Sequence, residues 1–229
     1  KILMKNILIC SHSEWSLQIT ENLIDYFHEQ SVLFKHCKTP EDLTKELEKN
    51  PKYELILFIG WNEIISKSIT DGYTCICLHP SLLPKYRGGS PIQHQMINGE
   101  KTSGVTIFQM NEGLDKGPVY FQKEFELKKK DLNMVFDEII KIGSNGFIKL
   151  INEIILDRDL IFTKQDEKEA TYFKRRSPEQ SEIFIEDLTN YTAQEISNKI
   201  NSLMDPYPNA FIKCRDGKKL FLSHSKYED

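Results

Sequence analysis

Strand-like and helix-like segments alternate over the first 80 residues, and this alternation limits the possible folds more than any other feature. Residues 6–10 are apolar and β-branched, which predicts a strand, and apolar residues at near-helical spacing over 16–29 predict a helix. The next expected elements are strand 31–35, helix 40–49, strand 54–59, helix 61–69 and strand 73–78. Strands separated by helices form parallel βαβ units, so we predict an α/β fold: a Rossmann-like, doubly wound, mostly parallel sheet.

The rest of the chain continues this pattern and then changes. Further elements are expected at helix 91–98, strands 104–110 and 119–125, helix 131–156, helix 193–204 and strands 210–214 and 218–223. Arg215, Asp216 and Gly217 join the last two strands and indicate a β-hairpin. We therefore expect a main domain over residues 1–170 and a small C-terminal helix plus β-hairpin region over 171–229.

Composition argues against several classes of protein. The 229 residues include 30 Lys and Arg against 34 Asp and Glu, and this net charge of −4 disfavours nucleic acid as a partner. The apolar segments are much shorter than the ~20 residues of a membrane helix, so no membrane partner is expected. The five cysteines are irregularly spaced and odd in number, which favours reduced thiols and a cytoplasmic location.

Common cofactor and metal motifs are missing. No GxGxxG follows the first strand and no GxxxxGK[ST] occurs anywhere, which disfavours nicotinamide and P-loop chemistry. Cys75 and Cys77 would share one face of a strand and have no second cysteine pair, so we expect no metal site.

A histidine and an aspartate stand where a parallel sheet binds ligands. His79 comes just after the fourth expected strand and precedes Pro80, which places its imidazole at the carboxyl edge of the sheet. Asp115 lies in a loop between Gly113 and Gly117, from which its carboxylate can reach that histidine. Such a pair can handle protons, although a lone histidine or aspartate in a loop more often has an ordinary structural role.

The segments around these two residues resemble a known family. The motif HPSLLP (79–84), followed by Arg87-Gly88 and later by LDKG (114–117), is similar in order and spacing to the 10-formyltetrahydrofolate-dependent formyltransferases. The segments YFKRRSP (172–178) and PYPNAF (206–211) resemble the part that follows the catalytic domain in the transfer-RNA and sugar branches. The resemblance implies an N-formyltransferase whose catalytic domain is residues 1–170.

The same resemblance implies roles for the pair and shows one departure. His79 would stabilise the oxyanion of the tetrahedral intermediate and relay protons, and Asp115 would help to take the proton of the amine. The family usually has Asn two residues before the histidine, and this chain has Cys77, whose thiol is a weak donor. Three accounts stay open: Asn62 or a backbone N–H compensates, the chain carries a substitution, or the protein binds folate without efficient turnover.

Binding residues are carried over from the family's segments. Candidates for 10-formyltetrahydrofolate are Asn62, Glu63, Ile64, Gly89, Asn111, Glu112, Gly113 and Leu114, and Gly89 offers only its backbone. Candidates for the amine substrate are Trp15, Lys85, Gln93, Lys174, Arg175 and Arg176. The basic residues suit a pyrophosphate and the tryptophan can stack on a base or sugar, while a solvated cluster and a core aromatic are the alternatives. Gln93 and His94 belong either to a polar helix face or to the substrate pocket.

Charge, length and the C-terminal segments distinguish the branches of the family. The net negative charge and the end of the chain at residue 229 disfavour the initiator transfer-RNA branch. The glycinamide ribonucleotide branch, which lacks the KYRGG continuation, is the alternative. We expect formylation of a dTDP- or UDP-linked deoxyamino sugar, a reaction of bacterial lipopolysaccharide and O-antigen synthesis. A homodimer is expected through the hairpin, by Phe211, Leu220 and Leu222.

Overall fold

A six-stranded sheet forms the centre of the computed structural model, which describes residues 4–228. The strand order is β2-β1-β3-β4-β6-β7. The strands are β1 (Lys5–Ser11), β2 (Val32–Cys37), β3 (Leu55–Ile59), β4 (Cys75–His79), β6 (Thr102–Gln109) and β7 (Val119–Glu126). The first four pair in parallel and the last two are antiparallel. The predicted α/β fold with a mostly parallel sheet is confirmed.

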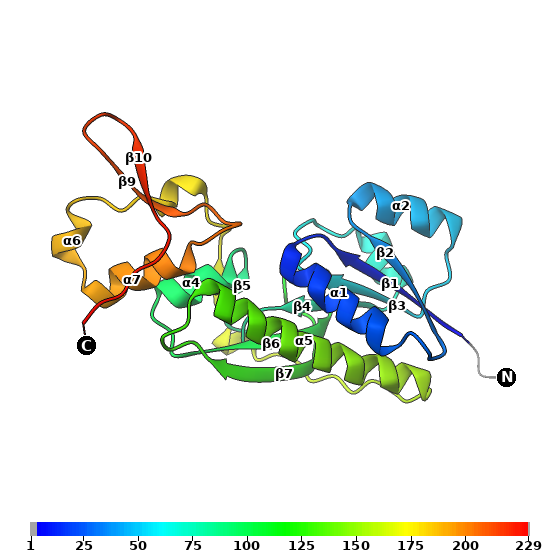
Figure 1. The fold of residues 1–229 in the computed structure, drawn as a ribbon. Helices are drawn as coiled ribbons and strands as arrows, with labels where there is room; N and C mark the ends of the chain where they lie inside the picture. Colours follow the sequence, from blue (N-terminus) through cyan, green and yellow to red (C-terminus); the bar gives the residue numbers. More distant parts are fainter. Residues whose placement is uncertain (1–3, 229) are drawn as a thin grey trace.

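Helices cover both faces of this sheet (Figure 1). The helices are α1 (Glu14–Tyr26), α2 (Pro40–Lys49), α3 (Lys67–Gly72) and α5 (Leu132–Ile155). α1 and α5 pack against strand residues such as Ile9 and Ile107, whereas α2 and α3 pack over Leu8 and Phe58 on the other face. Both faces are buried at the central strands β1, β3 and β4, which are mostly apolar, whereas β2 at the edge of the sheet carries Lys35 and His36. Within residues 4–228, no helix is both long and apolar enough to cross a membrane.

Local sequence explains where the helices begin. α2 starts after Thr39, whose side chain accepts a hydrogen bond from the Asp42 amide, and the Asp42 side chain accepts one from the Thr39 amide. Pro40 occupies the first helical position, where no amide donor is needed. α5 starts after Asp131, whose carboxylate accepts from the Met134 amide at 2.9 Å.

The predicted helix at residues 61–69 is wrong in its first half. Residues 61–66 form a loop and α3 begins only at Lys67. Gly60 follows β3 with a left-handed φ of 60°, and Trp61 packs edge-on against His12, which follows β1, at 5.8 Å between ring centroids. Tertiary packing of the tryptophan therefore overrides the helical spacing and leaves an open loop at the carboxyl edge of the sheet.

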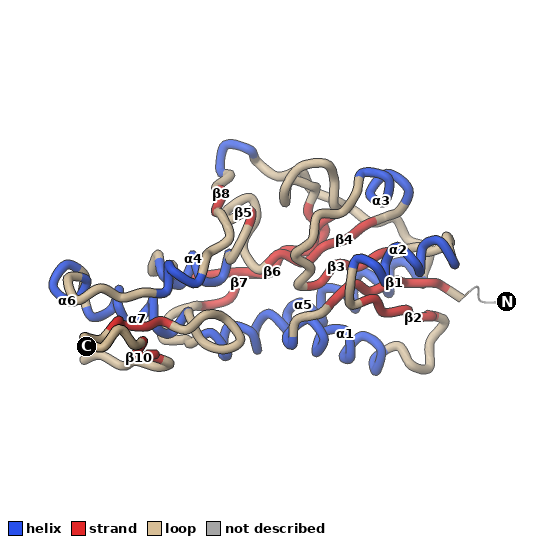
Figure 2. Tube along the Cα trace, turned by 90° about the horizontal axis from the view of Figure 1, so that it is seen from above, coloured by secondary structure: helices blue, strands red, loops and turns tan. Residues whose placement is uncertain are grey.

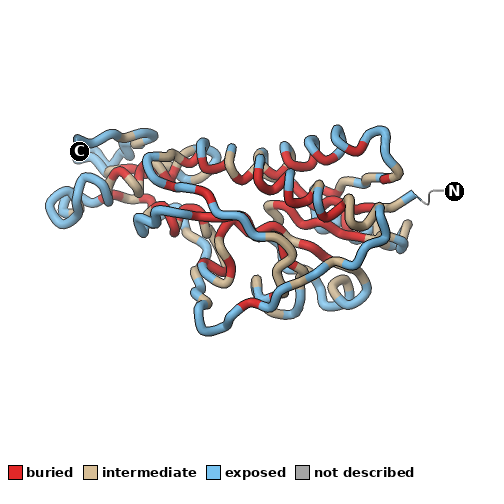
Figure 3. The backbone as a smooth tube through the Cα atoms, turned by 90° about the horizontal axis from the view of Figure 1, so that it is seen from below, coloured by how far each residue is buried: buried red, intermediate tan, exposed pale blue. Residues whose placement is uncertain are grey.

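The C-terminal part has a small core of its own. Its elements are β8 (Tyr172–Phe173), α6 (Asp187–Asn190), α7 (Ala193–Ser202), β9 (Ala210–Lys213) and β10 (Lys219–Leu222), with a short 3-10 turn at Pro178–Ser181. The chain before residue 170 also contains β5 (Arg87–Gly88), α4 (Pro91–Ile97) and a 3-10 turn at Glu167–Glu169. β9 and β10 form the predicted hairpin over a cluster of Ile183, Ile200, Leu203 and Ala210. Burial is densest in the sheet and sparse in this part (Figure 3).

One short pairing returns the C-terminal segment to the main domain. β5 pairs in parallel with β8, and the two lie side by side beyond the ends of β4 and β6 (Figure 2). The Tyr86 ring stacks on Phe173 at 4.7 Å between ring centroids. This pairing connects segments from before and after residue 170. The expected division of the chain into two domains at that residue therefore stays a prediction.

Candidate active site

His79 and Asp115 lie next to each other at the carboxyl edge of the sheet. His79 is the last residue of β4 and is buried, and its Nδ1 is 3.7 Å from Asp115 Oδ2. Its Nε2 is 2.7 Å from the carbonyl oxygen of Tyr86. A carbonyl only accepts hydrogen bonds, so we assign the proton of the neutral ring to Nε2, which leaves Nδ1 facing Asp115. The structure thus brings together the two residues that the sequence singled out.

The loop between β6 and β7 presents the Asp115 carboxylate. Asp115 has a left-handed φ of 53°, a conformation that aspartate tolerates better than most residues. Its Oδ2 accepts a hydrogen bond of 2.8 Å from the Gly88 amide. Gly88 itself has a φ of 98°, and a Cβ there would overlap the carbonyl oxygen of Phe173. Only glycine fits at this position, because the backbone of β8 passes so close.

Buried polar side chains hold the loop that follows His79. Gln95 Nε2 donates to the Pro80 carbonyl at 2.9 Å, and Thr106 Oγ1 donates to the Ser81 carbonyl at 2.6 Å. Ser81 Oγ in turn donates to the Lys85 carbonyl at 2.7 Å. The loop is therefore fixed before any ligand arrives, as a preorganised site requires.

Cys77 stands two residues before His79 on β4 and lies in the same site. Burial raises the pKa of its thiol, and the nearby Asp115 carboxylate raises it further. The group is therefore a neutral thiol at physiological pH, and in this structure its S–H donates to the Leu78 carbonyl at 3.6 Å. Asn62, the side chain considered as a substitute donor, is exposed and has no hydrogen bond to β4 in the described part of the chain.

The folate candidates occupy two neighbouring loops. Asn62, Glu63 and Ile64 lie in the loop after β3, and Asn111 to Leu114 lie in the loop after β6. An ion pair between Lys67 Nζ and Glu112 joins these loops. Ile64 is 99% exposed and Leu114 is 62% exposed, so both loops offer apolar side chains to a planar ring.

Three of the folate candidates already use a polar group in a hydrogen bond or ion pair within the protein. Gly89 donates its amide to the Phe173 carbonyl at 2.9 Å, so this N–H is not free for a ligand, and only its carbonyl remains as a candidate contact. Asn111 Oδ1 accepts from the Gly113 amide at 3.0 Å. The carboxylate of Glu112 is taken by Lys67.

Three of the amine-substrate candidates gather around a residue that the sequence analysis did not single out. Trp15 and Tyr207 both stack on Phe136, at 5.8 and 6.1 Å between ring centroids. Burial raises the pKa of the Tyr207 hydroxyl, which nearby Trp15, Arg175 and Gln93 partly offset. Gln93 is buried, and its Nε2 has no hydrogen-bond partner among the described residues. Tyr207 belongs to the PYPNAF segment, which was the only signal for it.

The other basic candidates differ in their exposure and in their hydrogen bonds. Lys85 and Lys174 are exposed, and the Lys174 carbonyl accepts a hydrogen bond from His94 Nε2 at 2.9 Å. Arg176 is half-buried, and its Nη2 donates to the Gln180 carbonyl at 2.7 Å. One nitrogen of its guanidinium is thus bonded to the C-terminal region, and its role toward a pyrophosphate stays a prediction. His94 packs against Phe173 at 4.7 Å between ring centroids, and its role stays a prediction.

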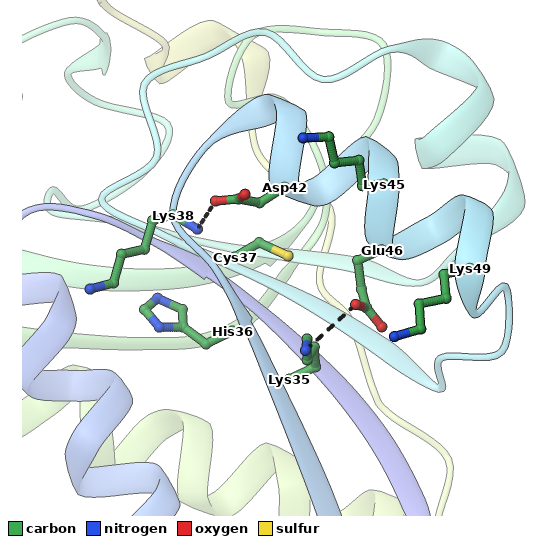
Figure 4. A pocket seen from close by; sticks show the side chains of 8 residues that line it. All are labelled: Lys35, His36, Cys37, Lys38, Asp42, Lys45, Glu46 and Lys49. Atoms are coloured by element: carbon green, nitrogen blue, oxygen red, sulfur yellow. Dashed lines mark hydrogen bonds and ion pairs between the residues drawn. The ribbon is translucent and has the colours of Figure 1, made fainter.

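A separate cavity of about 390 Å³ lies where β2 meets α2 (Figure 4). It is lined by Lys35, His36, Cys37, Lys38, Asp42, Lys45, Glu46 and Lys49. Lys35 Nζ is 3.7 Å from Glu46, and His36 Nε2 is 2.9 Å from Ser11 Oγ. Its lysines thus share the cavity with two carboxylates, and β1 and β3 separate it from β4. Within residues 4–228, no group of three or more His, Cys, Asp or Glu side chains is placed to hold a metal ion.

Comparisons with known proteins establish the family. The family described as "Formyl transferase" matches residues 16–151, more than half of the chain. A methionyl-tRNA formyltransferase of Wolbachia pipientis subsp. Culex pipiens is 32% identical over 197 residues, covering 83% of this chain and 62% of the relative. The chain belongs to the formyl transferase family, whose formyl donor is 10-formyltetrahydrofolate. It spans about three fifths of the length of the curated relatives it matches.

Solved structures agree with this assignment. A methionyl-tRNA formyltransferase from Clostridium thermocellum has a TM-score of 0.78 and 29% identity, covering 95% of this chain and 97% of that chain. A sugar N-formyltransferase from Shewanella sp. FDAARGOS_354 has a TM-score of 0.76 and 20% identity, covering 99% of each chain. The second likeness shows a shared fold.

The environment of Cys77 predicts its reactivity. Burial and the Asp115 carboxylate raise the pKa of the Cys77 thiol, and alkylation requires the thiolate. Iodoacetamide at pH 8 is therefore expected to label Cys77 at least ~10-fold more slowly than the exposed Cys214. Asp115→Ala removes the nearby negative charge and should accelerate labelling of Cys77. Peptide mass spectrometry gives the rate at each cysteine. Buried Cys10, whose pKa is raised without Asp115, is the control, and equal rates at Cys77 and Cys214 would contradict the expectation.

Proposed function

We propose that this protein transfers a formyl group from 10-formyltetrahydrofolate to the primary amine of a nucleotide-linked deoxyamino sugar. The observation that carries the transfer itself is the His79–Asp115 pair, 3.7 Å apart at the carboxyl edge of a formyl transferase sheet. The loops with Ile64 and Leu114 are the proposed folate site. The cluster of Trp15, Gln93 and Tyr207 is the proposed acceptor site.

The chemistry assigns a task to each side chain. The amine nitrogen attacks the formyl carbon, the carbonyl oxygen gains negative charge, and the bond to folate N10 then breaks as that nitrogen is protonated. Asp115 accepts the proton of the amine, directly or through His79 Nδ1, and the protonated imidazole stabilises the oxyanion. The Cys77 S–H supplies a second, weaker donor where the family usually has an amide.

The acceptor proposal rests on the chemistry around Tyr207. Stacked aromatic rings offer a surface to a base or sugar, and the unpartnered Gln93 amide offers a buried donor. Arg175 and Lys174 are exposed cations without an ion pair in the described structure, and they suit a pyrophosphate. The sugar N-formyltransferase from Shewanella has the same fold over 99% of both chains.

Methionyl-tRNA is the second candidate acceptor. It is favoured by the identity of 32% to the methionyl-tRNA formyltransferase of Wolbachia, which is higher than the identity to the sugar enzyme. The chain has a net charge of −4, and tRNA binding needs a positive surface, so we rank this candidate below the aminosugar. Glycinamide ribonucleotide, the alternative from the sequence, is the third.

A direct assay separates these acceptors. The protein is incubated with 10-formyltetrahydrofolate and with dTDP- or UDP-linked aminosugars, methionyl-tRNA or glycinamide ribonucleotide, and the added formyl mass is measured. We expect product with an aminosugar, and a loss of kcat of at least ~100-fold in His79→Ala, because the main proton carrier is removed. His36→Ala, outside the site, is the control and should remain active. Product with only one of the other acceptors would reassign the substrate.

Replacing the thiol tests whether the Cys77 departure weakens catalysis. An amide donor at an oxyanion is worth roughly 100-fold or more in rate, so Cys77→Asn is expected to raise kcat about tenfold. Cys75→Asn, on the same strand face but away from Asp115, should give no such gain. An unchanged rate in Cys77→Asn would show that another donor serves the oxyanion. Folate binding without turnover in the native chain, with activity restored by Cys77→Asn, would identify a weakened relative.

We also propose a homodimer through the hairpin. Among the strands of residues 4–228, β10 pairs only with β9, and its Leu220 and Phe221 are 55% and 60% exposed. An edge strand with apolar side chains favours pairing with a second copy. Of the residues expected at this interface, Leu220 is exposed, Phe211 is buried and Leu222 packs on the small core. Phe221, which pairs with Phe211 across the hairpin, is exposed.

Sedimentation velocity tests this dimer. The native protein is expected at the mass of two chains, and Phe221→Glu at the mass of one, because a buried unpaired carboxylate is costly at an interface. Tyr191→Glu, an exposed aromatic outside the hairpin, should remain dimeric. A single-chain mass for the native protein would rule the dimer out.

A further inference from the structure

A buried arginine and a buried glutamine lie directly behind the Asp115 loop, and nothing in the proposed reaction yet uses them. Arg87 is fully buried, although it carries a charge, and its Nη1 and Nη2 donate to the two carboxylate oxygens of Glu167 at 3.0 and 2.7 Å. The same guanidinium donates to Oε1 of Gln165, from Nε at 3.2 Å and from Nη2 at 2.8 Å. Gln165 is buried as well.

The other end of the Gln165 amide holds the loop. Its Nε2 donates to the backbone carbonyls of Asp115 at 2.8 Å and of Gly117 at 2.7 Å. Arg87 offers only donors and the carbonyls only accept, so the orientation of the amide is fixed on both sides. Every hydrogen-bonding capacity of this side chain is used, which is unusual unless its geometry matters.

Asp115 is therefore held from two directions by neighbouring residues of one strand. Gly88 donates its amide to the carboxylate, and Arg87 reaches the backbone carbonyl of Asp115 through Gln165. The left-handed φ of Asp115 turns that carbonyl toward Gln165 while the carboxylate points to His79. Without the Gln165 amide, nothing in the described structure bonds the Asp115 carbonyl, and the loop can relax to another conformation.

We propose that Gln165 is a positioning residue: held by Arg87, it keeps the Asp115 loop in the left-handed conformation that aims the carboxylate at His79. It acts on the reaction only through Asp115 and touches no substrate. This inference rests on the proposed formyl transfer for its kinetic readout, and a second readout that needs no substrate separates the two.

The kinetic test is a double-mutant cycle. Gln165→Met removes both donors to the loop, and we expect kcat to fall about tenfold or more with a change of less than about threefold in KM for the formyl donor. In the Asp115→Ala background, Gln165→Met should change kcat by less than about twofold, because its effect is transmitted by Asp115. Equal losses in the two backgrounds would show a general structural role and overturn the proposal.

The spectroscopic test uses the ring signals of His79 in ¹⁵N-histidine-labelled protein, identified by their loss in His79→Ala. Gln165→Met and Asp115→Ala should both shift these signals, without substrate present. Gln30→Met is the control, because the Gln30 amide also donates to a carbonyl, that of Tyr26, at the far end of α1. An unchanged His79 signal in folded Gln165→Met would overturn the proposal even if no acceptor is ever found.

A second variant covers the case in which Gln165→Met fails to fold. Gln165→Glu keeps the size of the side chain and its acceptor for Arg87, but a carboxylate cannot donate to the carbonyls of Asp115 and Gly117. We expect the same loss of kcat and the same shift at His79. Retention of native kcat and native His79 signals in Gln165→Glu would also overturn the proposal.

Discussion

The hydrogen bond from the Gly88 amide to the Asp115 carboxylate is the contact on which the geometry of the site depends. It joins the loop after β4 to the loop after β6, and the carboxylate that accepts it also faces His79. Gly88 belongs to β5, which pairs with β8 from the far C-terminal segment. One short strand thus links the sheet, the aspartate loop and the chain beyond residue 170, and a side chain at Gly88 would break all three links.

A second feature of the site is that its polar groups are buried and that nearly all of them have hydrogen-bond partners. Gln95, Thr106 and Ser81 bond the backbone after His79, and Gln165 bonds the backbone at Asp115. A buried network of this kind lowers the stability of the fold if some of its groups lack partners, and it makes the site rigid if all of them are paired. The exceptions are informative, because the unpartnered Gln93 amide lies in the cluster that we propose for the acceptor.

Much of the fold and the central pair of the site could be predicted. Short apolar runs between helical segments located every strand of the main sheet, since the central strands are buried on both faces. The loop at residues 61–66 could not be found in this way, because Trp61 packs on His12, a residue far away in the chain. His79 and Asp115 were accessible through their motifs, whereas Gln165 stands in a polar stretch without periodicity and Tyr207 in a segment known only by resemblance.

The sequence by itself determined the class of fold, the family and the two side chains at the carboxyl edge, because these follow from local periodicity, proline and glycine positions, and motif order. Only the tertiary structure decided which groups surround them. The partners of Asp115 come from residues 27 and 50 positions away in the chain, Gly88 and Gln165. Such contacts arise from the crossing of distant segments, and no local pattern records them.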